Sequence, residues 1–527
     1  MQAQHRYPVG VQVFEKIRLQ GYLYADKTEY VWRMAHEAGG YYFLSRPRRF
    51  GKTLLVSTME AYFQGRQELF RGLAIDRLER EWVRHPVIRL DLSDFKETEV
   101  ADLKTKIGDL LAPFEATYGI SNPSPLPSSR IDAIIRAAYA QTGEDVVVLV
   151  DEYDAPLLNV MHDPRRLQEF REIMRAFYAP LKKDEEYLRF VFLTGITKFS
   201  QLSIFSELNN LNNVSMDVAY AGVCGITAEE LDGKLTPDVE ALAGRMDVSA
   251  DECRRELKRM YDGYRFSKAE DMEVYNPFSL ISAFAKGEIA PYWFASGTPS
   301  VLVDMLREGD LSVPELEGIK VAVTEFDAPA EDMDNPVAFM YQSGYLTIKG
   351  YDKLLDAYAL GIPNAEVSDG LYKALLPAYT GVGQLATGSF LMRFAGSLLR
   401  SHDAEGAMRQ LQAFLAGIPY DMAPKSEKDF QTVLYLVLEL MGAYVQTEVR
   451  VATGRIDAVV DAGAVVYVIE LKYRRTGKST PTSADAMRQI DERGYAAPYV
   501  GRGKRVVKVG VCYSEEKRTL DEGWVIR

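Results

Sequence analysis

The segment Ser45-Arg-Pro-Arg-Arg-Phe-Gly-Lys-Thr53 decides the fold of the first third of this sequence. It follows Tyr41-Tyr-Phe-Leu44, an apolar run typical of a strand, and it leads into a helix that we predict from about Lys52 to Phe63. Its last three residues match the end of the pattern G-x-x-x-x-G-K-S/T, although Arg46 stands where that pattern has its first glycine. Backbone N–H groups and the dipole at a helix start bind anions. The segment therefore predicts a phosphate-binding loop.

The residue types in this loop suggest individual roles. Lys52 would reach the β- and γ-phosphates of a nucleotide, and the Thr53 hydroxyl would bind Mg²⁺. A side chain at Gly51 would block the close approach of the backbone to phosphate. Arg48 and Arg49 would either neutralise phosphate charge or form an exposed basic turn, and the sequence leaves both alternatives open.

A second element supports the nucleotide interpretation. Val146-Val-Val-Leu-Val-Asp-Glu-Tyr-Asp154 predicts a buried strand that ends in acids. Asp151 would hold Mg²⁺ through water and Glu152 would polarise the attacking water, although two acids can also simply end a strand in a solvated turn. Leu193-Thr-Gly-Ile-Thr197 follows another apolar run and could place Thr194 beside the γ-phosphate as a sensor.

Strands and helices alternate throughout this region. Strands are also predicted at Val87–Leu92 and Leu188–Leu193, with amphipathic stretches between the strands. This order is typical of a parallel sheet with crossover helices. A Pro- and Ser-rich stretch at 121–129 is interpreted as a surface loop within the domain. We therefore expect an α/β fold.

The middle of the chain changes character. After about Val223 helix-like segments dominate, including Asp251–Tyr261 and Pro277–Phe284. Further on, residues 335–348 predict a short helix that turns into a strand, and Ala357–Pro363 predicts a partner strand after a turn around Gly350. A helix followed by a hairpin resembles a winged helix, but such units are common in other folds. A helical stretch at 387–415 follows.

Acids and a lysine recur near the C-terminus, in Gly454–Asp461 and Val465–Lys472. Two strands joined by a short turn would bring Asp457 and Glu470 together, and the period of two points Glu470 and Lys472 to the same face. Two carboxylates and an ammonium suit Mg²⁺-assisted phosphodiester hydrolysis, with Lys472 orienting or activating water. An ordinary salt bridge between strands explains the same spacing equally well.

Two further residues are candidates for this site. Glu427, at the start of a helix predicted from Lys428 to Gly442, could add a metal ligand, although an acid in a first helical turn is favourable by itself. Gln489 lies on the helical stretch Ala484–Arg493 and could contact water or the nucleic-acid backbone beside the acids, but the sequence does not determine which side of the helix faces them.

The segment after Glu470 is locally basic, with ten Lys and Arg against Asp485, Asp491 and Glu492. Such an excess suits a phosphate backbone, and it is also typical of a solvated face. The bases are Lys472, Arg474, Arg475, Lys478, Arg488, Arg493, Arg502, Lys504, Arg505 and Lys508.

Composition sets the wider limits. The chain has 527 residues, enough for roughly three or four domains, and its 47% hydrophobic and 26% charged residues are ordinary for globular proteins. The net charge of −13 argues against a protein that coats nucleic acid through bulk charge. Three distant cysteines and five scattered histidines argue against a disulfide framework and a His- or Cys-based metal site. The start has no apolar signal region and no apolar run reaches membrane-spanning length, so we expect a cytoplasmic protein with no membrane partner.

Taken together, these motifs resemble a bacterial and archaeal family that couples an AAA-ATPase-like N-terminal domain to a C-terminal nuclease-like domain of the PD-(D/E)xK superfamily. That family favours Arg-Pro-Arg-Arg-Phe before Gly-Lys-Thr, so Arg46 conforms to it. The motifs, in order, are Tyr24–Lys27, Arg46–Thr53, Asp151–Asp154, Tyr261–Phe266, Tyr275–Phe278, Gly454–Asp457, Glu470–Lys472 and Gln489–Tyr495. We interpret Tyr261–Phe266 and Tyr275–Phe278 as structural, packing the helical region on the ATPase core.

The resemblance implies ATP and Mg²⁺ as cofactors, with Mn²⁺ also suited to the nuclease site. It implies DNA as a partner through the basic segment, and it leaves a homo-oligomer open. The expected nucleotide-binding residues are Arg46, Pro47, Arg48, Arg49, Phe50, Gly51, Lys52, Thr53, Asp151 and Thr194. The expected catalytic residues are Glu152, Asp457, Glu470 and Lys472, and the expected metal ligands are Thr53, Asp151, Asp457, Glu470 and Glu427.

The expected domains are a P-loop ATPase at 1–223, a helical lid at 224–310, a winged-helix-like and helical region at 311–420, and a restriction-endonuclease-like α/β domain at 421–527. The leading hypothesis is an ATP-hydrolysing protein coupled to a metal-dependent DNA nuclease. The alternatives are a nucleotide-controlled switch that binds nucleic acid without cutting it, and an ATPase that acts on protein.

Overall fold

The computed structural model describes residues 5–37, 39–197, 210–268, 272–294, 300–308, 311–326, 336–442, 445–451, 454–500, 503–521 and 523–527. Its contacts divide the chain into two compact units. Unit 1 comprises Met1–Ser296 and Glu317–Glu366, and unit 2 comprises Gly297–Leu316 and Val367–Arg527. The domain boundaries predicted at 223, 310 and 420 remain predictions; the contacts group 317–366 with unit 1 and 367–420 with unit 2.

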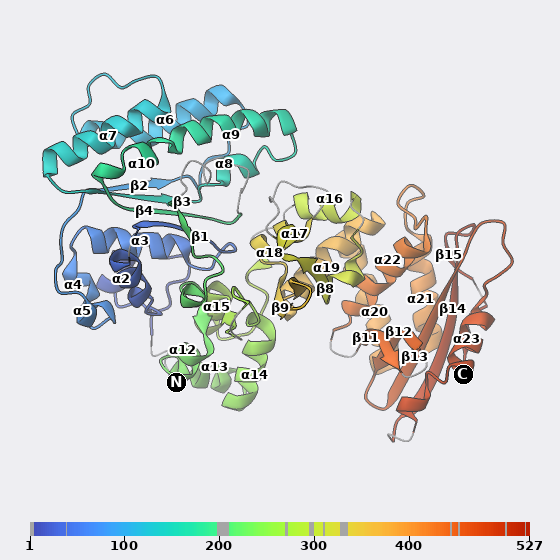
Figure 1. Ribbon diagram of the computed structural model, residues 1–527. Helices are drawn as coiled ribbons and strands as arrows, with labels where there is room; N and C mark the ends of the chain where they lie inside the picture. The colour runs from blue at the N-terminus through green and yellow to red at the C-terminus, as the bar shows by residue number, and fades with distance from the viewer. Residues whose placement is uncertain are drawn as a thin grey trace. The chain divides into compact units, whose positions relative to one another are not determined.

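A parallel sheet forms the centre of unit 1, with the strand order β2-β3-β4-β1-β5 (Figure 1). The predicted strands are confirmed, and the short β5 is an addition. Because all five strands run parallel, their carboxyl ends meet at one edge, where Asp91 lies beside Asp151 and Ser45 beside Gly195. The strands are β1 (Tyr41–Ser45), β2 (Val87–Asp91), β3 (Val146–Asp151), β4 (Leu188–Gly195) and β5 (Asn212–Asn213).

Helices cover both faces of this sheet, as the parallel order requires (Figure 1). The six residues of β3 are all buried, which explains its unbroken apolar sequence. On one face lie α6 (Val100–Thr117), α7 (Pro127–Thr142), α9 (Pro164–Tyr178) and α10 (Pro180–Lys183). On the other lie α2 (Thr28–His36) and α3 (Lys52–Phe63), with α1 (Phe14–Leu19), α4 (Gln67–Phe70) and α5 (Ile75–Leu78) packed around them. The α8 helix (Ala155–Leu158) follows β3.

A helical part of unit 1 follows the sheet, as predicted. Three of its helices begin at side-chain caps, because the oxygens of Thr227, Ser249 and Asn276 each accept a backbone N–H from the first turn. The elements are α12 (Ala228–Asp232), α13 (Thr236–Met246), α14 (Ala250–Tyr261) and α15 (Pro277–Lys286), with the short strands β6 (Ile226–Thr227) and β7 (Val274–Tyr275).

A helix followed by a hairpin completes unit 1, as predicted, but the turn is not around Gly350. Gly350 lies inside β9, and the turn spans 353–356 because the Asp352 carboxylate accepts the N–H groups of Leu354 and Leu355. Asn335 lies outside the described residues, and the winged-helix interpretation stays a prediction. The elements of the predicted unit are α18 (Pro336–Ser343), β9 (Thr347–Asp352) and β10 (Ala357–Gly361). They are preceded by β8 (Ile319–Ala322) and α17 (Val323–Phe326), and the three strands form an antiparallel sheet of order β8-β10-β9.

Unit 2 holds a mixed sheet of order β11-β12-β13-β14-β15, with β16 on β14. The strands are β11 (Val445–Val451), β12 (Gly454–Asp461), β13 (Val465–Arg474), β14 (Arg505–Ser514), β15 (Thr519–Leu520) and β16 (Val525–Ile526). Its helices are α16 (Ser300–Glu308), α20 (Gln384–Ala395), α21 (Ala404–Ala416), α22 (Glu427–Glu439) and α23 (Ser483–Glu492). The α19 helix (Ala365–Thr380) begins in unit 1 and continues into unit 2.

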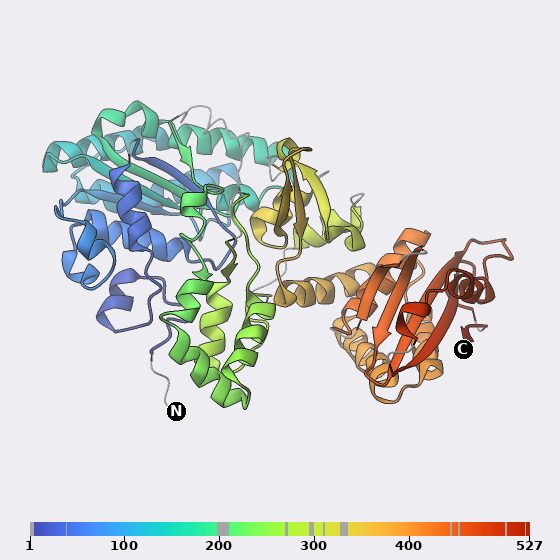
Figure 2. The same cartoon turned by 60° about the horizontal axis from the view of Figure 1, so that its bottom comes forward.

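The two faces of β13 pack against different helices (Figure 2). Val466 and Val468 contact α23 through Met487 and Ile490. On the opposite face, Phe430 of α22 stacks on Tyr513 of β14 at a centroid distance of 4.6 Å. Even-numbered residues of β13 therefore face α23, which decides where Glu470 and Lys472 point.

The described residues bear on two expectations from the sequence, those for the cysteines and for membrane-spanning helices. Cys224, Cys253 and Cys512 are buried free thiols. Among the helices described, not one has both the length and the apolar character needed to cross a membrane.

Candidate functional site

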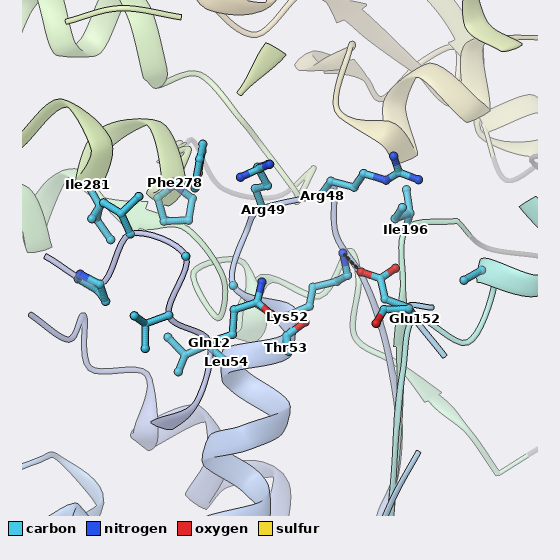
Figure 3. A pocket seen from close by; sticks show the side chains of 18 of the residues that line it. Gln12, Arg48, Arg49, Lys52, Thr53, Leu54, Glu152, Ile196, Phe278 and Ile281 are labelled. Atoms are coloured by element: carbon cyan, nitrogen blue, oxygen red, sulfur yellow. Dashed lines mark ion pairs between the residues drawn. The ribbon is translucent and has the colours of Figure 1, made fainter. Parts of the chain in front are cut away.

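A cavity of about 580 Å³ lies in unit 1 beside the predicted phosphate-binding loop (Figure 3). One side is formed by the loop and the start of α3, another by Glu152 and the segment after β2. Pro8–Gln12 and the start of α15 close the remaining side, and sequence reasoning missed both. The lining includes Arg48, Arg49, Gly51, Lys52, Thr53, Ser93, Phe95, Lys96, Glu152, Asn159, Pro277, Phe278 and Ile281.

Lys52 and Glu152 meet in this cavity, with Nζ and Oε1 3.2 Å apart (Figure 3). Lys52 is 3% exposed and also donates to the carbonyl oxygens of Arg46 at 3.1 Å and Pro47 at 3.3 Å. Glu152 has φ 52°, a left-handed conformation that non-glycine residues rarely adopt and that clusters at functional sites. The two residues that the sequence analysis assigned to phosphate and to water are therefore in contact.

The backbone explains the glycine of the loop. Gly51 has φ 95° at the start of α3, a conformation that favours glycine. A Cβ built at Gly51 would have no neighbour within 4 Å. The left-handed backbone is therefore the structural reason for glycine in the protein itself, and the expected clash of a side chain with phosphate stays a prediction.

Asp151 lies fully buried at the end of β3, and neither of its carboxylate oxygens has a hydrogen-bond partner among the described residues. Burial is the main cause that raises the pKa of Asp151 to about 6, and the Glu152 charge adds to it, while Thr53 and Lys52 act in the opposite direction. A carboxylate with free oxygen valences near a threonine hydroxyl fits a hard divalent cation. Asp151 itself does not line the cavity, so its role as a Mg²⁺ ligand beside Thr53 stays a prediction, one that the unpartnered buried carboxylate fits.

Arg46 does not line the cavity. Its guanidinium is buried beneath the loop, where it donates to the carbonyl oxygens of Ser45 at 2.9 Å, Ser215 at 2.7 Å and Tyr220 at 3.2 Å. It also stacks over the Phe266 ring at 4.1 Å. The structure thus gives Arg46 a supporting position rather than the nucleotide contact that we expected, because its guanidinium donates to the sequence-distant carbonyls of Ser215 and Tyr220 as well as to Ser45.

We expect Arg46→Ala to lower the stability of unit 1 by about 3 kcal/mol, because it leaves buried carbonyls without a donor and opens a cavity. Thermal unfolding should show a midpoint lower by about 5 °C or more. Arg48→Ala is the matched control, since Arg48 lines the cavity, and its midpoint should stay at the wild-type value. A wild-type midpoint for Arg46→Ala would show that this arginine does not support the loop.

Pro47 and Phe50 also lie outside the cavity lining. Phe50 is buried and packs edge-on against Tyr264 and Phe266, with centroid distances of 4.7 and 5.5 Å. The predicted packing role of Tyr261–Phe266 is therefore observed at the loop itself. Arg49, in contrast, lies over the Phe278 ring at 4.0 Å on the cavity side (Figure 3).

Thr194 is buried, and its hydroxyl donates to the Leu44 carbonyl at 2.7 Å. It does not line the cavity, so it is not placed as the expected phosphate sensor. The turn after it is organised by Asp154, whose carboxylate accepts from the Thr197 N–H at 2.7 Å and the Thr197 hydroxyl at 2.5 Å. Gly195 is required there, since a Cβ would lie 2.3 Å from an Asp154 oxygen.

The predicted carboxylate site forms in unit 2, on the α23 side of the sheet. Asp457 Oδ2 accepts the Leu471 N–H at 2.8 Å, so it lies next to Glu470 where β12 and β13 meet. Lys472 Nζ donates to Glu470 Oε1 at 3.0 Å and to Gln489 Oε1 at 2.7 Å. The Gln489 amide also donates to Glu470. The predicted convergence of Asp457, Glu470 and Lys472 is observed, and Gln489 joins them.

A cavity of about 760 Å³ opens beside these residues. Lys472, Gln489 and Tyr495 line it together with the exposed loop residues Thr480 and Pro481 and with charged residues of α23. The cavity is large enough for a sugar-phosphate segment of a nucleic acid to approach Lys472 from solvent.

Glu427 lies elsewhere. It is exposed in the first turn of α22, whose cap is Ser426, and no contact to Asp457 or Glu470 is found among the described residues. In the part of the chain that the structure describes, no group of three or more His, Cys, Asp or Glu side chains could hold a metal ion. The two carboxylates of Asp457 and Glu470 are nevertheless a sufficient set for Mg²⁺, because this ion binds one or two carboxylates and takes its other oxygens from water and phosphate.

Comparison with known proteins finds a family match over each of the two regions that hold the candidate sites. A family model described as "Predicted AAA-ATPase" matches residues 8–205, and a "PD-(D/E)XK nuclease superfamily" model matches residues 425–523. An "Uncharacterized protein in vnfD 5'region" from Azotobacter chroococcum mcd 1 is 36% identical over 528 residues, covering 98% of each chain. The chain belongs to this AAA-ATPase-like family with a C-terminal PD-(D/E)XK nuclease domain. The loop side of the cavity in unit 1 lies in the matched ATPase region, whereas Pro277, Phe278 and Ile281 line it from outside that region. Asp457, Glu470 and Lys472 lie in the matched nuclease region.

The basic segment of the nuclease domain is less positive than its sequence suggested. Lys504 pairs with Asp461 at 2.6 Å, Lys508 pairs with Asp491 at 2.7 Å, and Arg474 pairs with Asp521. Asp461 and Asp521 lie outside the segment, so a count within it could not include them. Arg502 falls outside the described residues.

Proposed function

We propose that the protein binds and hydrolyses ATP in the ATPase domain, cleaves DNA by metal-dependent phosphodiester hydrolysis in the nuclease domain, and uses the nucleotide to control cleavage. The observation that carries this proposal is the presence of two assembled sites on one chain. Lys52, Thr53, Asp151 and Glu152 gather at the first, and Asp457, Glu470, Lys472 and Gln489 at the second.

In the ATPase domain, Lys52 would exchange its loop carbonyls and Glu152 for the phosphates. Released from Lys52, Glu152 would orient the attacking water and accept its proton. Thr53 and Asp151 would hold Mg²⁺, which would neutralise phosphate charge. The apolar wall of Val9, Val11, Phe278 and Ile281 suits the nucleobase.

Binding calorimetry with ATP tests this site directly, with and without Mg²⁺. We expect saturable binding that is stronger with Mg²⁺, and its absence from Lys52→Ala. Equal heats for wild type and Lys52→Ala would contradict the assignment.

In the nuclease domain, Asp457 and Glu470 would hold Mg²⁺ or Mn²⁺, which would polarise the scissile phosphate. Lys472, held by Glu470 and Gln489, would orient the attacking water and carry a positive charge close to the phosphate. Glu470 is only 2% exposed, so water screens its ion pair with Lys472 less than it would at the surface.

DNA would contact the cations that have no acidic partner. Arg475 and Lys478 lie on the exposed loop between β13 and α23, near Thr480 and Pro481 of the cavity, and no partner for either side chain is found in the described residues. Lys504 and Lys508 are already neutralised.

We therefore expect the double variant Arg475→Ala/Lys478→Ala to weaken DNA binding and to reduce the slope of log affinity against log salt by about two. Lys504→Ala/Lys508→Ala is the matched control and should change the slope much less. Fluorescence anisotropy of labelled duplex between 50 and 200 mM salt, about the range in which such contacts differ most, measures both. An equal change in the two double variants would contradict this assignment of the DNA surface.

One observation favours a second candidate function, a nucleotide-controlled switch that binds DNA without cutting it. Only two acids lie at the nuclease site among the described residues, and one oxygen of Glu470 already accepts from Lys472 and Gln489. Under this alternative DNA binds, Glu470→Gln has no effect, and no cleavage occurs with Mg²⁺ or Mn²⁺.

We also propose a cytoplasmic location, since ATP and DNA both occur there. The resemblance leaves a homo-oligomer open, and size-exclusion chromatography with light scattering would test it.

A further inference from the structure

A buried tryptophan contacts the phosphate-binding loop from outside the cavity. The Trp293 indole N–H donates to the Arg48 carbonyl oxygen at 3.1 Å. In a trans peptide the carbonyl and the following N–H point in opposite directions, so this bond fixes the orientation of the Arg49 N–H. Arg49 has φ 66° and Gly51 has φ 95°, two uncommon conformations that the loop must keep to present its donors.

Trp293 is itself held in place. Its ring packs edge-on against Tyr345 at a centroid distance of 5.3 Å, and its backbone N–H donates to Glu366 Oε1 at 2.7 Å. The same oxygen accepts from the Tyr292 N–H at 2.5 Å and the Ser279 hydroxyl at 3.0 Å.

Burying the carboxyl group of Glu366 at this position costs folding free energy. It is fully buried, and its second oxygen has no hydrogen-bond partner among the described residues. Burial raises the pKa of Glu366 to about 7, against the hydrogen bonds from Trp293, Ser279 and Tyr292. A buried acid for which no cation partner is found among the described residues weakens the fold relative to a neutral residue, which favours a positioning role over a stabilising one.

The place of Glu366 in the chain supports this view. It is the last residue of unit 1 and the second residue of α19, which continues into unit 2. Tyr292 and Trp293 precede Ser296, where the chain also leaves unit 1. One carboxyl group therefore joins two of the segments through which the chain passes between the units, and Trp293 links that junction to the loop.

We propose that Trp293 and Glu366 are positioning residues of the phosphate-binding loop, so that nucleotide affinity depends on the hydrogen bonds that these two residues make within unit 1. This inference rests on the proposed nucleotide site. Neither residue lines the cavity, so an effect on affinity passes through Arg48 or, for Glu366, also through α15, whose Ser279 donates to it.

Two pairs of variants test the proposal in the full-length chain by ATP calorimetry and thermal unfolding. Trp293→Phe keeps a ring against Tyr345 and removes the N–H, and we expect the ATP Kd to rise about five- to tenfold with a nearly unchanged unfolding midpoint. Glu366→Ala should raise the Kd similarly, whereas Glu366→Gln keeps an acceptor oxygen and should restore it. Wild-type affinity in Trp293→Phe and Glu366→Ala would overturn the inference.

A spectroscopic readout separates positioning from loss of structure. In a chain with Trp32→Phe, Trp82→Phe and Trp524→Phe, Trp293 is the sole tryptophan. Its emission should change on ATP addition with a midpoint equal to the calorimetric Kd. Unchanged emission in a chain that still binds ATP would overturn the inference alone. Absence of ATP binding by the wild-type chain would overturn the proposed nucleotide site and this inference with it.

Discussion

Glu152→Gln should bind ATP at least as tightly as the wild-type chain and lose hydrolysis by about 100-fold or more. The amide cannot accept a proton from water. It also no longer forms the ion pair in which the Glu152 carboxylate, 3.2 Å from the Lys52 ammonium, competes with the phosphates for that ammonium. Lys52→Ala should instead lose both binding and hydrolysis, since it removes the buried cation that the phosphates require. Phosphate release and calorimetry on the same preparations measure the two effects.

Lys183→Ala is a suitable control for these variants, because that lysine is exposed and pairs with Asp132 away from the cavity. It should hydrolyse ATP at the wild-type rate. Turnover by Glu152→Gln at the wild-type rate would contradict the role given to Glu152 and would move the general base to another residue.

The second large effect is expected in the nuclease domain. Glu470→Gln should reduce DNA cleavage by about 1,000-fold or more, since a neutral amide is a poor ligand for a hard cation and loses its ion pair with Lys472. The substitution keeps the size of the side chain, so the unfolding midpoint should change little. End-labelled DNA with Mg²⁺ or Mn²⁺ gives the rate, and phosphate release should be unaffected.

Glu492→Gln provides the matched control. Glu492 lines the same cavity from α23, its side chain is 70% exposed, and its nearest described cation is Arg488 at 4.0 Å. Its cleavage rate should equal that of wild type. Equal loss in both variants would mean that the negative charge of the cavity matters and not the position of Glu470.

Local patterns predicted the parts of each site that are close in sequence. The loop, its strand and α3 follow from one continuous segment, and Asp457, Glu470 and Lys472 follow from a hairpin with a period of two. Gln489 could be suspected from its helix, but only the packing of α23 on Val466 and Val468 fixed its direction.

Features that depend on distant partners could not be predicted in this way. Arg46 turns inward because the carbonyls of Ser215 and Tyr220 lie beneath the loop, and both are far away in sequence. Thr194 turns to Leu44 on the neighbouring strand rather than to the cavity. The neutralisation of Lys504 and Arg474 depends on Asp461 and Asp521, which the local charge count did not include.

The association of Pro8–Gln12 and α15 with the nucleotide cavity has the same origin. The two segments are far apart in sequence, and the residues with which they line the cavity include no acid, base or nucleophile. The available signal was the Asn276 cap followed by Pro277 and Phe278, which placed a helix start without saying what it faced.

The central claim is that one chain carries an ATP site that controls a separate DNA-cleaving site. The measurement that tests it most directly is cleavage of labelled single-stranded, duplex and branched DNA with Mg²⁺ or Mn²⁺, with and without ATP, by wild type, Lys52→Ala and Glu470→Gln. The account predicts cleavage by wild type that responds to ATP, cleavage by Lys52→Ala that does not respond, and none by Glu470→Gln. Cleavage by Glu470→Gln at the wild-type rate, or no cleavage by a wild-type chain that binds ATP, would contradict it.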